Sequence, residues 1–242
     1  MKLNLPCTLC AALTQEDSID EIQLVETELR DDGAYLCHCA KGHPFTVFLQ
    51  QQHFEMLFEL GLNAAIDGYY REAVSNFAAS LERFYEFSLH IFMLANAVSQ
   101  DQWLGVWNKV KNASERQIGA YAFMHLAMLH EPAKLLNDKQ VSFRNSVVHK
   151  GTIPTLAAAL EFGEVVRAII LKGSAEFNWN FSDEMRAAKM HRRVIPEGAL
   201  PGMVVSYFFY PTVLAFDFLE RNDKDSLSLL EIVEQRKKRR KS

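Results

Sequence analysis

Arg144, Asn145 and His149 lie within six residues of one another and are the side chains of this sequence best suited to chemistry. Asn145 and His149 are four residues apart, so a helix places them on one face, with Arg144 beside them. The guanidinium is a permanent cation that can hold a phosphate, and an imidazole, whose ordinary pKa lies near neutrality, can move a proton. The combination predicts chemistry at a phosphodiester. The sequence pattern places the motif at the start of a helix.

Helical periodicity surrounds this motif on both sides. Apolar residues recur at three- to four-residue spacing in four stretches: 51–67, 70–92, 101–130 and 156–172. The third stretch is expected to break near 112–114, and Thr155 is a suitable N-cap for the fourth. The sequence therefore predicts a helical bundle that positions the motif.

The order of these elements resembles the HEPN superfamily. A helix that opens with Tyr70-Arg71-Glu72-Ala73-Val74 comes first, followed by the Arg-Asn-x-x-x-His motif, a His-Lys-Gly turn, a proline and a closing helix. The resemblance covers about residues 51–172 and implies an up-and-down four-helix bundle. It also implies a metal-independent endoribonuclease that acts on RNA as a homodimer, with both motifs facing one composite cleft. A toxin-like or antiphage role, controlled by an antitoxin or another regulatory partner, is implied by the same analogy.

The resemblance also assigns roles to individual side chains. His149 would help the 2′-hydroxyl of RNA attack its neighbouring phosphate or protonate the leaving oxygen, and Arg144 would stabilise the pentacovalent phosphate. Asn145 would orient the histidine or bond the sugar, or act as a helix N-cap. Glu82, on the opposing helix, would pair with Arg144 or aim it. Ordinary structural interpretations are a carbonyl hydrogen bond for His149, a salt bridge for Arg144 and surface exposure for Glu82.

All four cysteines fall within the first 39 residues, which favours a metal site over scattered structural thiols. Cys7 and Cys10 form a C-x-x-C pair, and strand-like sequence separates them from Cys37, Cys39 and His43. This pattern predicts a zinc ribbon with one structural Zn²⁺ per chain. Cys39 with His43 is favoured as the second ligand pair, and Cys37 with Cys39 is the alternative. Four protein ligands leave no open coordination position, so no catalytic metal is expected.

The formal net charge of −4 combines an acidic chain with a basic end. Residues 236–241 are six consecutive cations, and removing them from the 26 basic residues leaves 20 against 30 acidic ones, a balance of −10. The basic end either contacts a phosphate backbone or is a solvated helix end. The sequence contains neither a long apolar run nor a signal-peptide pattern, which predicts a cytoplasmic protein without membrane insertion.

The chain is expected to be mainly α-helical, in three regions. These regions are a small β zinc ribbon at residues 1–50, with strands at 34–39 and 44–49, a HEPN-like bundle at 51–175, and a C-terminal helical extension at 176–242 that ends in the basic tail. The apolar stretch 203–218 within the last region is either core or a partner-facing surface. The competing function, from another class, is a non-catalytic HEPN-like scaffold or a nucleotide- or nucleic-acid-binding module.

Overall fold

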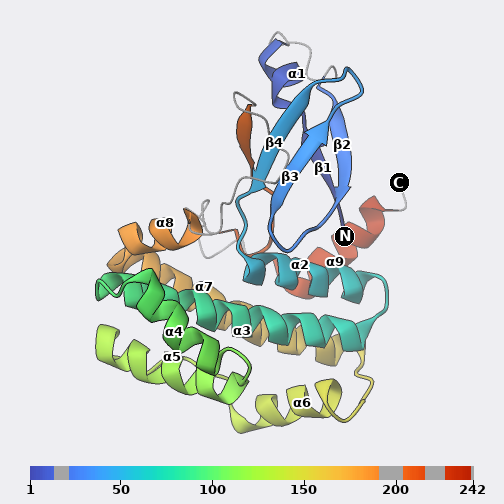
Figure 1. The fold of residues 1–242 in the computed structure, drawn as a ribbon. Helices are drawn as coiled ribbons and strands as arrows, with labels where there is room; N and C mark the ends of the chain where they lie inside the picture. Colours follow the sequence, from blue (N-terminus) through green and yellow to red (C-terminus); the bar gives the residue numbers. More distant parts are fainter. Residues whose placement is uncertain (14–21, 191–203, 216–226, 241–242) are drawn as a thin grey trace. The chain divides into compact units, whose positions relative to one another are not determined.

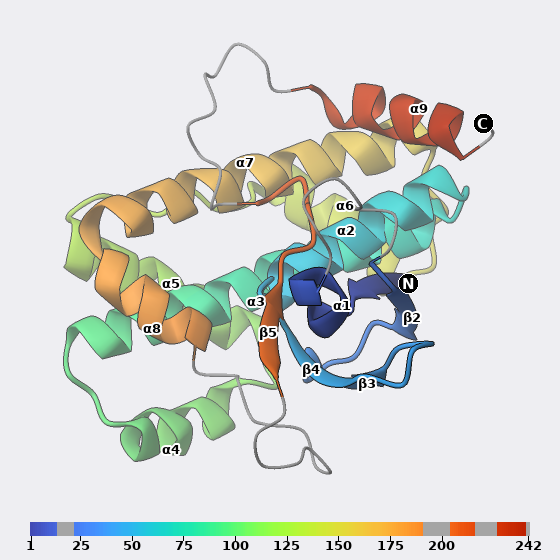
Figure 2. The same cartoon turned by 90° about the horizontal axis from the view of Figure 1, so that it is seen from above.

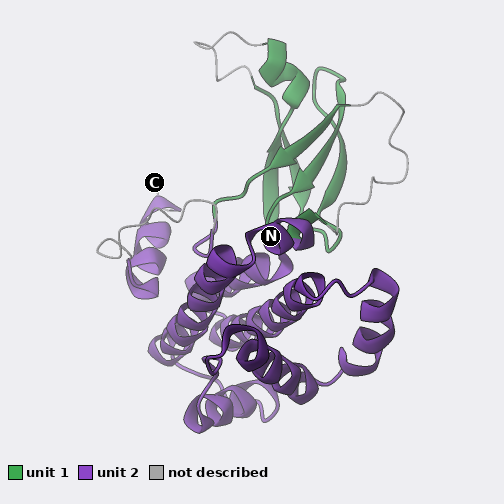
Figure 3. Cartoon of the chain, turned by 90° about the vertical axis from the view of Figure 1, so that its left-hand side faces the viewer, with its two compact units in different colours: residues 1–51, 189–211 green, residues 52–188, 212–242 purple. Residues whose placement is uncertain are grey.

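The computed structural model describes residues 1–13, 22–190, 204–215 and 227–240. These parts contain nine helices and five strands and are mainly helical, as predicted. They belong to two compact units (Figure 3): a strand unit of residues 1–51 and 189–211, and a helical unit of residues 52–188 and 212–242. None of the helices in the described parts is long and apolar enough to cross a membrane.

The strand unit contains two small sheets. Its elements are β1 (Lys2–Pro6), α1 (Thr8–Leu13), β2 (Leu24–Glu28), β3 (Ala34–His38), β4 (Pro44–Leu49) and β5 (Val205–Phe208). β1 and β2 pair antiparallel, whereas the second sheet has the order β3-β4-β5, with β3 and β4 antiparallel and β4 and β5 parallel. The strands predicted at 34–39 and 44–49 are confirmed. The sequence analysis did not anticipate β1, α1 or β2.

β5 comes from a part of the chain far from its partner strand. Phe48 of β4 pairs with Tyr207 of β5, and their rings stack with centroids 6.0 Å apart. Parallel strands need a long crossover connection, and here the helices between the two strands provide it. The region 176–242, expected to be a helical extension, is therefore divided between the two units. Residues 203 and 216–218 of its apolar stretch lie outside the described residues.

The helical unit is built around α3. Its helices are α2 (His53–Ile66), α3 (Tyr70–Ala95), α4 (Gln100–Val110), α5 (Ser114–Leu129), α6 (Asp138–Val148), α7 (Leu156–Asn180), α9 (Leu229–Arg239) and most of α8 (Ser182–Met190). α2, α5, α6 and α7 all pack against α3, which crosses the middle of Figure 1. The break near 112–114 is confirmed between α4 and α5. Thr155 caps α7 as predicted, because its hydroxyl accepts the Ala158 N–H at 3.2 Å.

Aromatic side chains fill the centre of the helical unit. The fully buried ones include Phe54, Phe58, Phe77, Phe84, Phe92 and Phe177. Two glycines let the neighbouring helices approach α3 closely. A Cβ on Gly61 of α2 would lie 2.6 Å from Phe77, and one on Gly163 of α7 would lie 2.8 Å from the same ring. This packing makes α3 a fixed support for the residues that its other face presents, including Glu82.

α9 packs against α2 and α7 (Figure 2). Arg236 forms an ion pair with Glu59 of α2, whose side chain is only 1% exposed. Arg240 pairs with Asp67, at a half-exposed position just after α2. Two of the six consecutive cations thus hold α9 in place. Lys241 lies outside the described residues.

Candidate functional site

Cys7, Cys10, Cys39 and His43 lie together in the strand unit. Cys7 follows β1 and Cys10 lies in α1, whereas Cys39 and His43 flank the turn between β3 and β4. Within that turn Gly42 has a φ of +81°, which glycine adopts without strain, and its N–H donates to the Cys39 carbonyl at 2.9 Å. This turn brings Cys39 and His43 close together, and the fold of the strand unit places them beside Cys7 and Cys10.

The separations between the four ligand atoms fit a tetrahedral metal ion. Cys10 Sγ lies 3.9 Å from Cys39 Sγ and 3.4 Å from His43 Nδ1, and Cys7 Sγ lies 3.9 Å from the same nitrogen. All four atoms lie within 4.8 Å of one another. A tetrahedron with Zn–S bonds of about 2.3 Å and Zn–N bonds of about 2.0 Å has edges of about 3.5–3.8 Å. These residues can therefore hold a metal ion.

Backbone N–H groups around the cluster act on the ionisation of its thiols. Burial raises the pKa of the Cys7 thiol, although the Cys10 N–H, 3.5 Å from its sulfur, acts in the opposite direction. Burial would also raise the pKa of Cys39, but the backbone N–H groups of His43 and Lys41, together with the Cys7 and Cys10 thiols, lower that pKa overall. Such donors stabilise a thiolate, which is the form that binds metal.

Cys37 stands apart from this cluster. It is buried in β3, where it pairs in register with Phe45, and it does not belong to the group of ligand atoms within 4.8 Å of one another. The sequence left two candidates for the second ligand pair. The structure places Cys39 and His43, and not Cys37 with Cys39, beside Cys7 and Cys10.

The Arg-Asn-x-x-x-His motif lies at the end of a helix, and the prediction that it opens one is wrong. Arg144 and Asn145 belong to the last turns of α6, and His149 is its C-cap. The N-cap is Asn137, whose side chain forms a reciprocal capping box with Gln140. Asn145 is consequently not the cap of this helix.

The end of α6 is held in place by several contacts. Arg71, in the first turn of α3, donates to the Val148 carbonyl at 3.5 Å. Gly151 follows with a φ of +76°, and the Thr152 N–H returns to the Ser146 carbonyl at 3.1 Å. His149 is exposed at this end and is therefore accessible from solvent.

Arg144 and Glu82 face each other across α6 and α3, as the sequence predicts. Their closest charged atoms are 3.8 Å apart, which is longer than a hydrogen bond. The side chain of Arg144 is 11% exposed and that of Glu82 is 30% exposed. Among the described residues, Glu82 is the only ion-pair partner of Arg144. The guanidinium donates no hydrogen bond to any of these residues. The nitrogens of this guanidinium are not among the buried polar atoms that lack a partner, so its unmatched donors are open to the cavity that Arg144 lines and are available to a ligand acceptor there.

Arg144, Glu82 and His149 line one cavity of about 330 Å³ at the end of α6. Lys111 and Gln117, from the α4–α5 corner, complete its wall. The sequence analysis missed both, because the break at 112–114 signals a turn without indicating what the turn faces. Asn145, in contrast, is not among the residues that line this cavity. The structure thus brings together three of the four residues predicted for catalysis.

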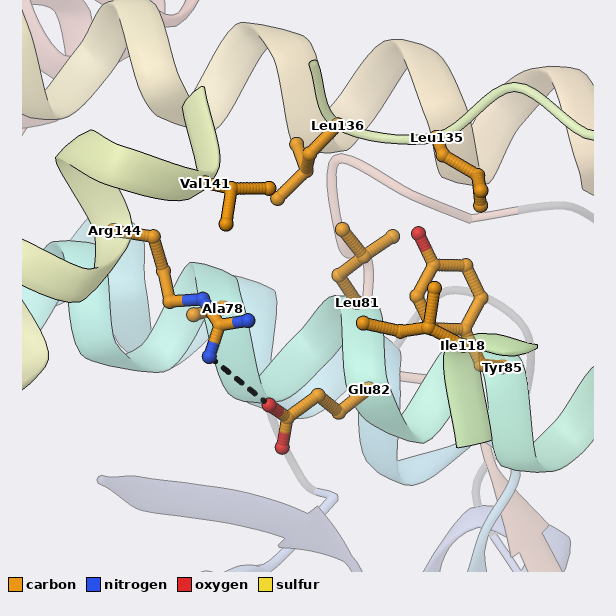
Figure 4. Close-up of a pocket in the computed structure, with 9 residues that line it drawn as sticks. All are labelled: Ala78, Leu81, Glu82, Tyr85, Ile118, Leu135, Leu136, Val141 and Arg144. Atoms are coloured by element: carbon orange, nitrogen blue, oxygen red, sulfur yellow. Dashed lines mark ion pairs between the residues drawn. The ribbon is translucent and has the colours of Figure 1, made fainter. Parts of the chain in front are cut away.

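A second, apolar cavity of about 80 Å³ adjoins the first, since Ala78, Glu82 and Arg144 line both. Figure 4 shows the Arg144–Glu82 pair on one side of it and Tyr85 on the other, with Leu81 between them. Polar recognition and apolar packing are therefore available side by side.

No protein family, curated protein or solved structure compared with this chain matches it. The function must therefore be argued from these residues.

Proposed function

We propose that this protein is a metal-independent endoribonuclease of the HEPN type. The observation that carries the proposal is Arg144, whose guanidinium is 11% exposed, lies 3.8 Å from its only described ion-pair partner and borders a cavity that also contains His149 and Lys111. A phosphate supplies the acceptors that such a guanidinium lacks, and a bidentate fork suits two phosphate oxygens.

The reaction uses the RNA's own 2′-hydroxyl as nucleophile. The O2′–P bond forms and the P–O5′ bond breaks, while one proton leaves the 2′-oxygen and another reaches the departing 5′-oxygen. His149 accepts or donates one of these protons, and Arg144 stabilises the charge of the pentacovalent phosphate. Glu82 aims Arg144 without contacting the substrate. In the proposed homodimer the second chain supplies another His149, so that one imidazole serves as base and the other as acid.

The metal ion that Cys7, Cys10, Cys39 and His43 could hold is proposed to be Zn²⁺, with a structural role. Three cysteines and one histidine are a ligand set typical of structural zinc, and four protein ligands leave no position for a reacting water. Cleavage accordingly involves no metal. A toxin-like or antiphage role with an antitoxin or regulatory partner is proposed on the resemblance of the sequence.

The test is incubation of the pure protein with total RNA in EDTA. Wild type should cleave, and the products should end in 2′,3′-cyclic phosphate because the nucleophile is internal. His149→Ala should slow cleavage by ~100-fold or more, the effect typical of losing a general acid or base. His130→Asn is the matched control, since His130 is an exposed histidine in a left-handed C-cap that asparagine tolerates.

Two results would reject the proposal. Equal cleavage by wild type and His149→Ala would indicate a contaminating nuclease and favour the binding-module alternative. Cleavage that depends on added magnesium would leave an enzyme with a different mechanism.

A further inference from the structure

Lys111 lines the large cavity together with Arg144 and His149, but the proposed cleavage gives it no task. Its side chain is exposed at the C-cap of α4, and its ammonium group forms no ion pair within the described parts of the chain. The cavity wall carries two permanent cations, Lys111 and Arg144, against one carboxylate, Glu82. Counting His149 as neutral, an occupant therefore meets an excess of positive charge, although the whole chain has a formal net charge of −4.

Two side chains of α5 bind the last carbonyls of α4 and fix the corner at which Lys111 lies. Gln117, which is 2% exposed, donates to the Lys111 carbonyl at 2.6 Å. Arg116 donates to the Lys109 carbonyl at 3.2 Å. The backbone of Lys111 is therefore fixed before a ligand arrives, and only its flexible side chain has to be ordered when the ammonium group binds.

The size and lining of the cavity suit more than one phosphate. Its volume of about 330 Å³ lies within the range of about 300–1,000 Å³ typical of small-molecule sites. Most of the lining residues are polar, and the apolar ones are Ala78, Ala79 and Val148. Hydroxyl, amide and cationic groups can bind the sugar and phosphates of a nucleic-acid strand, because these carry the matching donors and acceptors.

We propose that Lys111 binds the phosphate next to the one that Arg144 holds, so that the site recognises two consecutive phosphates of one RNA strand. The inference rests on the proposed function, because it takes the phosphate that undergoes cleavage to lie at Arg144. Contacts to two neighbouring phosphates fix the strand along the cavity and carry no information about the bases. Lys111 is thus a phosphate-binding residue that takes no part in the proton transfers.

The experiment measures binding of small nucleotides to the full-length protein by ligand-observed NMR at low ionic strength. The probes are cytidine 3′,5′-bisphosphate, which carries two phosphates on one sugar, and the 3′- and 5′-monophosphates of cytidine. None of them contains a phosphodiester, so binding is measured apart from cleavage. The bisphosphate should bind wild type about fivefold more tightly than either monophosphate, which is the most that an exposed ion pair contributes.

Lys111→Gln should remove this advantage of the bisphosphate, because glutamine lacks the charge, and Lys111→Arg should keep it. Lys109→Gln is the matched control, since Lys109 is exposed on the same helix but does not line the cavity. Its bisphosphate advantage should equal that of wild type. An undiminished advantage in Lys111→Gln, or an equal loss in Lys109→Gln, would overturn the inference and leave Lys111 as a cation at a helix end.

A second readout uses a single strand of 2′-O-methyl RNA, which lacks the nucleophile. The slope of the logarithm of its binding constant against the logarithm of salt concentration reports the number of phosphates contacted. That slope should be about 0.7 smaller in magnitude for Lys111→Gln than for Lys109→Gln, the value for one phosphate of a single strand. Equal slopes would contradict the contact.

These measurements separate the two proposals. If RNA is cleaved but Lys111→Gln keeps the bisphosphate advantage, the endoribonuclease stands and the second phosphate contact is rejected. If the advantage depends on Lys111 but no RNA is cleaved, the two-phosphate site stands and catalysis is rejected.

Discussion

Removal of Arg236 should destabilise the helical unit severely, although the residue belongs to a run of cations that reads as a free basic tail. Glu59, its partner on α2, is 1% exposed, and the second carboxylate oxygen of Glu59 already lacks a hydrogen bond. Arg236→Met keeps much of the aliphatic packing but leaves a buried, uncompensated charge. Such a change costs about 3–5 kcal/mol, against a total stability of about 5–15 kcal/mol for a typical domain.

The assay is urea unfolding followed by far-ultraviolet circular dichroism. Arg240→Met is the matched control, since the side chains of Arg240 and Asp67 are 47% and 48% exposed and such pairs contribute about 0–1 kcal/mol. A double substitution, Arg236→Met with Glu59→Met, should recover most of the loss because it removes both charges. If Arg236→Met cost no more than Arg240→Met, Glu59 would not depend on Arg236, and the reasoning about α9 would be refuted.

Three further predictions follow from other parts of the structure. The purified protein should carry about one metal ion per chain, and Cys10→Ser should abolish it in an elemental analysis; a folded wild type without metal would contradict the tetrahedral site. Gly163→Ala should cost about 1–3 kcal/mol in urea unfolding, because its Cβ would lie 2.8 Å from Phe77, whereas Gly119→Ala, which meets open space, should not destabilise. The protein should be a homodimer in light scattering at micromolar concentration, and a strict monomer would count against a composite cleft.

The features set by local spacing were predictable from the sequence. A C-x-x-C pair and a C-x-x-x-H turn place their own side chains, so the spacing indicated Cys7 and Cys10 and favoured Cys39 with His43 over the alternative pair, Cys37 with Cys39. Thr155 was recognisable as a cap for the same reason, since capping depends on neighbours along the chain. The start of α6 was equally local: Asn137 and Gln140 have the spacing of a capping box, and overlooking it led to the wrong position for the motif within its helix.

The features set by distant contacts were not predictable. β5 pairs with β4 across about 160 residues, and a short apolar run does not specify which strand it joins. Lys111 lines the large cavity together with Glu82 and Arg144, and the sequence does not indicate that the corner between α4 and α5 packs beside them. Tyr85 lies on the apolar stripe of α3 and reads as an ordinary core residue. Only the packing of α5 and α6 against α3 creates the cavity that its hydroxyl faces.

The single-turnover rate of RNA cleavage in EDTA, measured for Arg144→Lys beside wild type, tests the central claim most directly. Lysine keeps the charge but replaces the planar fork by a point charge, so cleavage should fall by about tenfold or more while the unfolding curve stays that of wild type. Arg83→Lys is the control, because Arg83 lies on the same helix as Glu82 but pairs with Glu86. It should cleave at the wild-type rate. Equal rates for Arg144→Lys and wild type, or no cleavage by wild type, would contradict the account.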